Sequence, residues 1–269
     1  MECIIKLFIL TTMRISILLF TLLLVAVSCK KEEIVTNTPT TDNTPKGRLV
    51  FHLHTFIGDS TVKKYNINIK TKEGRTISLN RAQMYISDIQ LIKGDGSVYK
   101  VARKGVLKEF DSESVVIGDV NVGNYKFIRF KVGLEPETNL LLPTAEGYSN
   151  LLNQSEMWFN NTPKANEYVF LNFAGKIDTT KAMNGETIPF EYKIGGNDNL
   201  IQIEMPEKGL TILEGQIGYG HMIIDYSKFF TNIDLTKNEN LTIQSLADNK
   251  KPRVTTLKTN IASMFKYEN

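Results

Sequence analysis

The sequence predicts an all-β fold, an antiparallel β-sandwich with a short C-terminal helix. Segments of alternating apolar and polar residues recur from residue 47 onward with turn residues between them, a spacing typical of two packed antiparallel sheets. The longest segment, LNRAQMYISDIQLI (79–92), carries apolar residues on both faces, as an interior strand does. Near the end, Val254, Leu257 and Ile261 recur at helical spacing, which predicts the closing helix.

The other elements follow from the same patterns. After the turn Gly94-Asp95-Gly96, residues 98–101 are expected to return as a hairpin partner of the 79–92 strand. The turn Gly123-Asn124 predicts a second hairpin, between 115–122 and 125–132. Further strands are predicted over 49–54, 65–70, 168–174, 190–193, 200–205, 210–218 and 221–226, and helices over 147–154 and 254–267. No change of composition divides residues 47–269, which indicates one domain.

Residues 1–28 are predicted to be a lipoprotein signal peptide. Arg14 precedes an apolar run over 15–27, so a start at Met13 suffices, and we interpret residues 1–12 as a misassigned start. The run ends in Ala26-Val27-Ser28 before Cys29, which resembles a bacterial lipobox and implies cleavage before Cys29 and a lipid on its thiol. The alternative is an uncleaved membrane anchor, which takes about 20 apolar residues and for which this run is short.

Residues 29–46 are predicted to be the lipidated cysteine and a flexible tether. The stretch is rich in Thr, Asn and Pro and poor in apolar residues, a composition typical of solvated linkers. Lys31-Glu32-Glu33 resembles an export signal of Bacteroidota outer-membrane lipoproteins, although a solvated charge run has the same composition. We therefore expect a protein anchored by lipid to the outer membrane, facing the periplasm or the cell surface.

Cysteine content and charge exclude several classes of protein. The only cysteines are Cys3 and Cys29, so the predicted domain has no disulfide and no thiol nucleophile and must depend on its hydrophobic core. The formal charge of the whole chain is +3, with basic and acidic residues scattered along it. Such a balance gives no support for a nucleic-acid partner.

Several segments resemble one protein family. RAQMYISDIQLIKGDG (81–96) resembles the core motif of MbnP-like proteins, β-rich envelope proteins named after a periplasmic copper protein associated with methanobactin. Residues 119–134 are similar to the family's Gly-x-Tyr hairpin and Val-Gly turn, Met157-Trp158 to its Met-aromatic-Trp segment, and 259–265 to the closing helix of its Bacteroidota members. The resemblance spans most of residues 48–266 and implies an MbnP-like sandwich over 47–269, with copper as its cofactor.

The chain departs from the family at two histidine motifs. Where the family has an Asn-His pair after the Val-Gly turn, this chain has Asn139-Leu140. Where the family has His-Leu-Gly, this chain has Lys193-Ile194-Gly195. The family's copper ligands therefore cannot be transferred to this chain residue by residue.

Five residues are candidate metal ligands. His52 and His54 are two apart on a predicted strand, so their side chains leave one face and form a two-point ligand for copper or zinc. His221 and Met157 are further donors, although nothing in the sequence brings them near the pair. In copper-binding relatives a tryptophan can be oxidised to kynurenine and join the site, which makes Trp158 a candidate by resemblance. The alternatives are a solvated strand face for the histidines and core packing for Trp158.

The sequence does not predict an enzyme. It contains no Gly-x-Ser-x-Gly, phosphate-binding glycine loop or His-Glu-x-x-His motif. Two functions remain. One is a lipid-anchored protein that binds or handles copper. The other is a non-catalytic module that binds a glycan, peptide or partner protein through exposed aromatic residues, for which Tyr148, Tyr219 and Phe229 are candidates.

Overall fold

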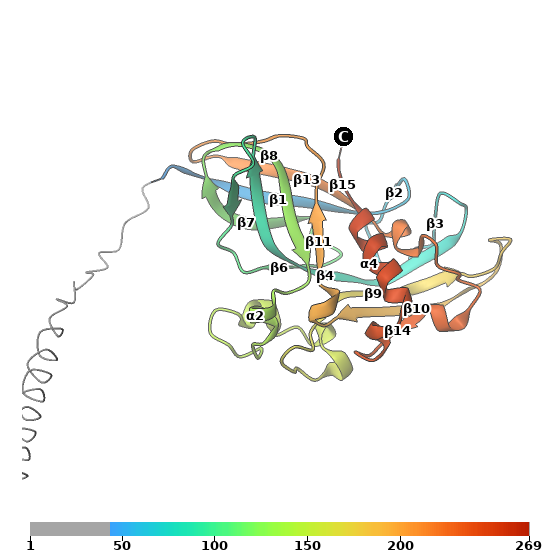
Figure 1. Cartoon of the computed structure of the whole chain (residues 1–269). Coiled ribbons are helices and arrows are strands. Elements are labelled where there is room, and N and C mark those ends of the chain that lie inside the picture. The colour runs from blue at the N-terminus through green and yellow to red at the C-terminus, as the bar shows by residue number, and fades with distance from the viewer. Residues whose placement is uncertain (1–43, 269) are drawn as a thin grey trace, which may run out of the picture. The chain divides into compact units, whose positions relative to one another are not determined.

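The chain folds into two β-sheets that pack face to face around a hydrophobic core (Figure 1). The computed structural model describes residues 44–268, and the chain from Thr44 onward forms one compact unit by its own contacts. The predicted signal peptide and Cys29 lie outside the described residues, as does most of the tether. Within 44–268, no helix has the length and apolar character that crossing a membrane requires.

The smaller sheet, called sheet A, is built around β1, the first strand of the described chain. Over the described residues it has five strands: β1 (Lys46–Ile57), β2 (Ser60–Thr61), β7 (Ser114–Asn121), β13 (Ile217–Asp225) and β15 (Phe265–Tyr267). One edge of β1 pairs with β13 in parallel, and its other edge pairs with β7 and β2 in antiparallel orientation. The antiparallel strand β15 then extends the sheet beyond β13.

The larger sheet, called sheet B, is organised around the predicted interior strand. Its ten strands within the described range are β3 (Ile69–Lys70), β4 (Thr76–Lys93), β5 (Val98–Lys100), β6 (Val106–Lys108), β8 (Gly123–Val132), β9 (Val169–Asp178), β10 (Thr187–Gly195), β11 (Ile201–Glu204), β12 (Leu210–Ile212) and β14 (Thr242–Ile243). Strand β4 lies between β8 and β9, and its hairpin with β5 forms as predicted. The all-β sandwich is confirmed. Both sheets are mixed, because β1–β13 and β10–β14 are parallel pairs.

Alternation along the strands divides the buried residues into two clusters. Phe51 of β1 and Ile86 of β4 belong to the main core between the sheets. Tyr85, one position before Ile86, points to the opposite face of sheet B and belongs to a second cluster there, together with Trp158. The outer face of sheet B is therefore covered, and β4 is buried on both faces.

Short helices cover the ends and the outer face of the sandwich. The α-helices are α2 (Pro136–Asn139), α3 (Ser149–Leu152) and α4 (Arg253–Ser263), and the 3₁₀ turns are η1 (Ser155–Met157), η2 (Phe159–Asn161), η3 (Asn197–Asn199), η4 (Tyr226–Phe230), η5 (Asn238–Asn240) and η6 (Asp248–Lys250). Figure 1 shows α4 and α2 in separate parts of the fold. The predicted C-terminal helix forms as α4, but it ends at Ser263 and the last residues continue as β15.

Three predicted elements are wrong. The predicted strand 210–218 is divided, because a turn over 213–216 separates β12 from β13. Residues 115–122 and 125–132 do not form a hairpin, because β7 pairs with β1 in sheet A while β8 pairs with β4 in sheet B. The chain crosses between sheets at Val122 and Gly123. The predicted strand 65–70 shrinks to Ile69–Lys70, because Asn66 adopts a left-handed φ of 61° and donates its N–H to Leu79 O at 2.7 Å.

Asp88 sits at an irregularity of the interior strand. Its φ of 46° is left-handed, and the register between β4 and β8 shifts between Ser87 and Gln90. The carboxylate is paired with Lys100 Nζ at 2.8 Å and Lys131 Nζ at 3.0 Å. Asp88 Oδ2 also accepts a hydrogen bond from Gln90 Nε2 at 2.9 Å, so Asp88 is a structural residue of sheet B.

Candidate metal centre

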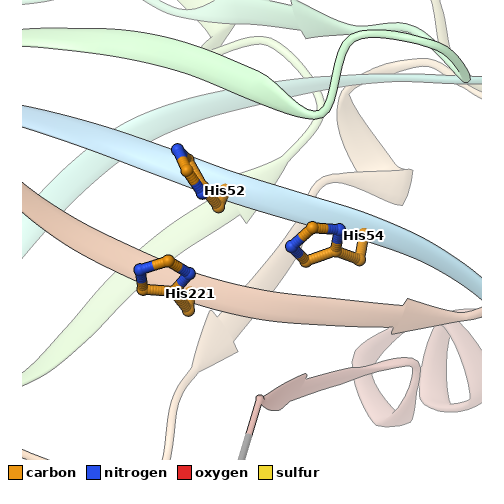
Figure 2. Close-up of side chains that lie close together, drawn as sticks. All are labelled: His52, His54 and His221. Atoms are coloured by element: carbon orange, nitrogen blue, oxygen red, sulfur yellow. The ribbon is translucent and has the colours of Figure 1, made fainter.

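Three histidines from two neighbouring strands converge on the outer face of sheet A. His52 and His54 lie two apart on β1, so both side chains leave the face opposite Phe51 and Leu53, which are in the main core. His221 lies on β13 as the register partner of His52. Figure 2 shows the three rings gathered above the two adjacent strands.

The geometry of the three rings suits one shared ion. Each histidine offers one ring nitrogen such that all three nitrogens lie within 4.8 Å of one another. The ring centroids of His52 and His221 are 4.7 Å apart, and those of His52 and His54 are 6.3 Å apart. Three imidazoles at such spacing need only small side-chain rotations to reach the metal–nitrogen distances of about 2.0–2.1 Å that copper and zinc prefer.

The surroundings of His52 favour the form of imidazole that binds metal. Burial lowers the pKa of His52 from its ordinary value of 6.5, and repulsion from His221 and His54 lowers it further. Only a neutral imidazole has a free nitrogen lone pair. At neutral pH, His52 is therefore available to a metal ion without prior loss of a proton.

Two carboxylates border the histidines. Glu113 Oε1 lies 3.7 Å from His54 Nδ1, and Glu268 Oε2 lies 3.5 Å from His54 Nε2 and 3.8 Å from His221 Nδ1. Glu113 comes from the segment that precedes β7, and Glu268 directly follows β15. Neither glutamate belongs to a local sequence motif, and both reach the site through strand pairing, so the sequence alone does not indicate them.

Tyr219 forms one side of the site. It lies two residues before His221 on β13, and its ring centroid is 4.9 Å from that of His52 and 5.7 Å from that of His221. Its side chain stays well exposed. The histidines therefore lie beside an exposed aromatic ring on an open face of the sheet.

Met157 and Trp158, which sequence analysis named with the histidines, lie elsewhere. Met157 is fully buried in the second cluster, and Trp158 packs against that cluster and donates its Nε1–H to Leu152 O at 3.0 Å. This cluster covers the outer face of sheet B, whereas the histidines occupy the outer face of sheet A. Both sheets and the main core separate Trp158 from the histidines, so Trp158 packs as a structural residue.

The aromatic residues named for a binding module also separate. Phe229 is fully buried in the main core, which corrects its expected exposure. Tyr148 packs against the second cluster beside a surface cavity of about 560 Å³ lined by Leu151 and Gln154. Only Tyr219 of the three is exposed, and it adjoins the histidines.

Comparison with known proteins places the chain in a family. A family model described as MbnP matches residues 46–262, which is most of the chain. The chain belongs to the MbnP family. A solved structure, MbnP from Methylosinus trichosporium, is 11% identical, with a TM-score of 0.48, and the match covers 71% of this chain and 80% of that chain. No curated protein matches the chain.

In this MbnP-family chain the asparagine of the altered Asn-His motif, Asn139, has a structural role, whereas Leu140 at the histidine position is exposed. Asn139 is fully buried, donates to Asn197 Oδ1 at 2.7 Å and accepts a hydrogen bond from Tyr168 N at 3.3 Å. Asn139 therefore fastens the end of α2 to η3 and to the residue before β9. The three histidines of the chain meet on sheet A instead.

Proposed function

We propose that this MbnP-family protein binds a copper ion at His52, His54 and His221. The observation that carries the proposal is the convergence of one nitrogen from each ring within 4.8 Å. Copper is the metal linked to the family, and imidazole nitrogens are among its preferred ligands. When bound, copper would supply a redox-active centre on the outer face of sheet A.

The residues of the chain have distinct roles in this proposal. His52 and His54 form a preorganised pair, because alternation on one strand fixes both on the same face. The parallel register of β1 and β13 brings His221 to the same place. The lowered pKa of His52 reduces competition from protons.

We further propose that the protein is a lipid-anchored component of the cell envelope, attached to the outer membrane through Cys29. The apolar run before Cys29 and the polar stretch after it support the anchor. Lipidation would confine a metal-binding domain to the membrane surface on a short tether. Mass spectrometry of the protein from membranes tests this step, with a diacylglycerol-modified Cys29 as the expected N-terminus.

The proposed role is binding or handling of the metal rather than catalysis. The histidines lie on an open strand face, where His221 and the neighbouring Tyr219 are exposed. A site of this kind is suited to accept an ion from solution or from another protein and to release it.

Equilibrium dialysis of residues 44–269 with Cu(II), followed by metal analysis, tests the proposal. We expect one copper per chain, with loss of stoichiometric copper in His52→Ala/His54→Ala and in His221→Ala. Ser114→Ala is the matched control, because Ser114 is the register partner of His52 on the other edge of β1 and offers no imidazole. Equal copper content in the parent and all variants would reject the site.

A further inference from the structure

Glu268 lies in the position of a fourth ligand. Its Oε2 atom is 3.5 Å from His54 Nε2 and 3.8 Å from His221 Nδ1, so one carboxylate oxygen borders nitrogens from both strands. Two adjacent ligand atoms at about 2.0–2.1 Å from one metal ion lie roughly 2.9 Å apart in the tetragonal geometry that Cu(II) prefers and roughly 3.3 Å apart in a tetrahedral one. The oxygen is therefore already near the separation from both nitrogens that shared coordination requires.

The backbone holds Glu268 at this place. Strand β15 pairs with β13, with Tyr267 opposite Met222, and the N–H of Glu268 donates to His221 O at 3.1 Å. The side chain is about 40% exposed, so it can rotate by the small amount that ligation requires. The C-terminal strand thus brings a carboxylate to the histidines.

The other nearby carboxylate has a different relation to the site. Glu113 lies 3.7 Å from Nδ1 of His54, the ring nitrogen on the side away from Glu268. A carboxylate beside the outer nitrogen of a ligating histidine accepts its N–H and orients the ring. The two glutamates therefore predict different effects on metal binding.

We propose that Glu268 is an oxygen ligand of the bound metal and that it makes the site selective for Cu(II) over Cu(I). This inference rests on the proposed copper site. Three neutral imidazoles and one carboxylate give a nitrogen–oxygen set that suits divalent copper, whereas Cu(I) is selected by soft sulfur ligands. The set contains no sulfur, and Met222, next to His221, is fully buried on the opposite face of β13.

Copper affinity and electron paramagnetic resonance of residues 44–269 test this inference, with Glu268→Gln compared to Glu113→Gln. We expect Glu268→Gln to weaken Cu(II) binding at least tenfold, to leave Cu(I) binding unchanged and to alter the Cu(II) spectrum. A tenfold fall in the ratio of Cu(II) affinity to Cu(I) affinity corresponds to a rise of about 59 mV in the reduction potential of the bound copper. Glu113→Gln should keep the parental spectrum, because it removes no ligand.

The outcomes separate this inference from the proposed function. A parent protein that binds copper, together with a Glu268→Gln variant of parental Cu(II) affinity and spectrum, would overturn the role of Glu268 and leave the histidine site standing. A parent protein that binds no copper would overturn both. Thermal unfolding of each variant checks that the fold is intact, and Glu268→Asp, which keeps the carboxylate, should retain part of the selectivity for Cu(II).

Discussion

His52 and His221 are direct register partners on the parallel strands β1 and β13, with ring centroids 4.7 Å apart. Side chains at partner positions leave the same face of a sheet, so this pairing adds a third imidazole to the pair on β1. The strands come from opposite ends of the domain. The site therefore depends on the long-range topology of sheet A rather than on a local motif.

The pKa of His52 should respond to its neighbours in opposite directions. In the metal-free protein, NMR titration should give His52 a pKa below 6.5, and His221→Ala should raise it by removing a repelling ring. Glu113→Gln should lower it further, because that carboxylate favours the imidazolium. Since the folded pKa lies below the unfolded one, this residue's contribution to stability is lost as pH falls through 6.5. An unchanged pKa of His52 in both variants would show that neither His221 nor Glu113 acts on its charge.

Replacement of Trp158 should leave metal binding intact. Trp158→Phe should keep the parental Cu(II) affinity, because the second cluster and the histidines occupy the outer faces of different sheets. Loss of the hydrogen bond to Leu152 O should lower the free energy of unfolding by about 1 kcal/mol. Copper titration and urea unfolding check the two effects. A variant that no longer binds copper but remains folded would contradict the placement of this residue.

Asp88 should stabilise sheet B through its charge and its backbone conformation. Asp88→Asn keeps a residue that tolerates left-handed φ but loses the pairing with Lys100 and Lys131, and should cost about 1–3 kcal/mol of unfolding free energy. Asp88→Ala should cost about 1 kcal/mol more, because alanine lacks that tolerance.

Acid should reduce the effect of Asp88→Asn. Burial would raise the pKa of Asp88, but hydrogen bonds from Lys100, Gln90 and Lys131 outweigh it and leave the pKa below the ordinary 3.8. A depressed carboxyl pKa gives stability that is fully present above pH 3.8 and is lost progressively as pH falls toward the lower pKa of the folded state. Urea unfolding at pH 7 and pH 3 measures the change. An equal cost at both pH values would mean that charge is not the cause.

Lys108 should make stability rise with pH. Its ammonium is almost fully buried and donates to the carbonyls of Glu109 and Phe110, and burial lowers its pKa from 10.5 to about 8. Between these values the unfolded chain binds more protons, so the free energy of unfolding increases with pH. Relative to Lys108→Met, the parent should gain about 3 kcal/mol from pH 7 to above pH 10.5. Tyrosine ionisation affects both proteins, so a constant difference between them would contradict the lowered pKa.

Strand β4 shows how far sequence predicts this fold. Apolar residues on both faces of 79–92 predict an interior strand, and β8 and β9 flank it. The pairing of strands is not predictable in the same way, because alternation fixes the face on which a side chain lies but not which strand lies beside it. The hairpin expected at Gly123-Asn124 fails for this reason. That short turn connects strands of two sheets, and β7 pairs with β1.

The candidate site was predictable only in part. Alternation was enough to place His52 and His54 on one face, but nothing local to His221 indicates that β13 pairs in parallel with β1. The position of Glu268 is harder still to predict from the sequence, because it depends on β15 pairing with β13 after helix α4. For Met157 and Trp158 the sequence predicted too much. The family resemblance suggested metal ligands, whereas packing in the second cluster explains both residues.

A crystal structure of residues 44–269 loaded with Cu(II), with anomalous data at the copper edge, would locate the proposed metal site. We expect one anomalous peak on the outer face of sheet A, within about 2.0–2.2 Å of a ring nitrogen of each of His52, His54 and His221 and of an oxygen of Glu268. A peak elsewhere on the molecule, or no peak in crystals grown with excess Cu(II), would contradict the proposed site.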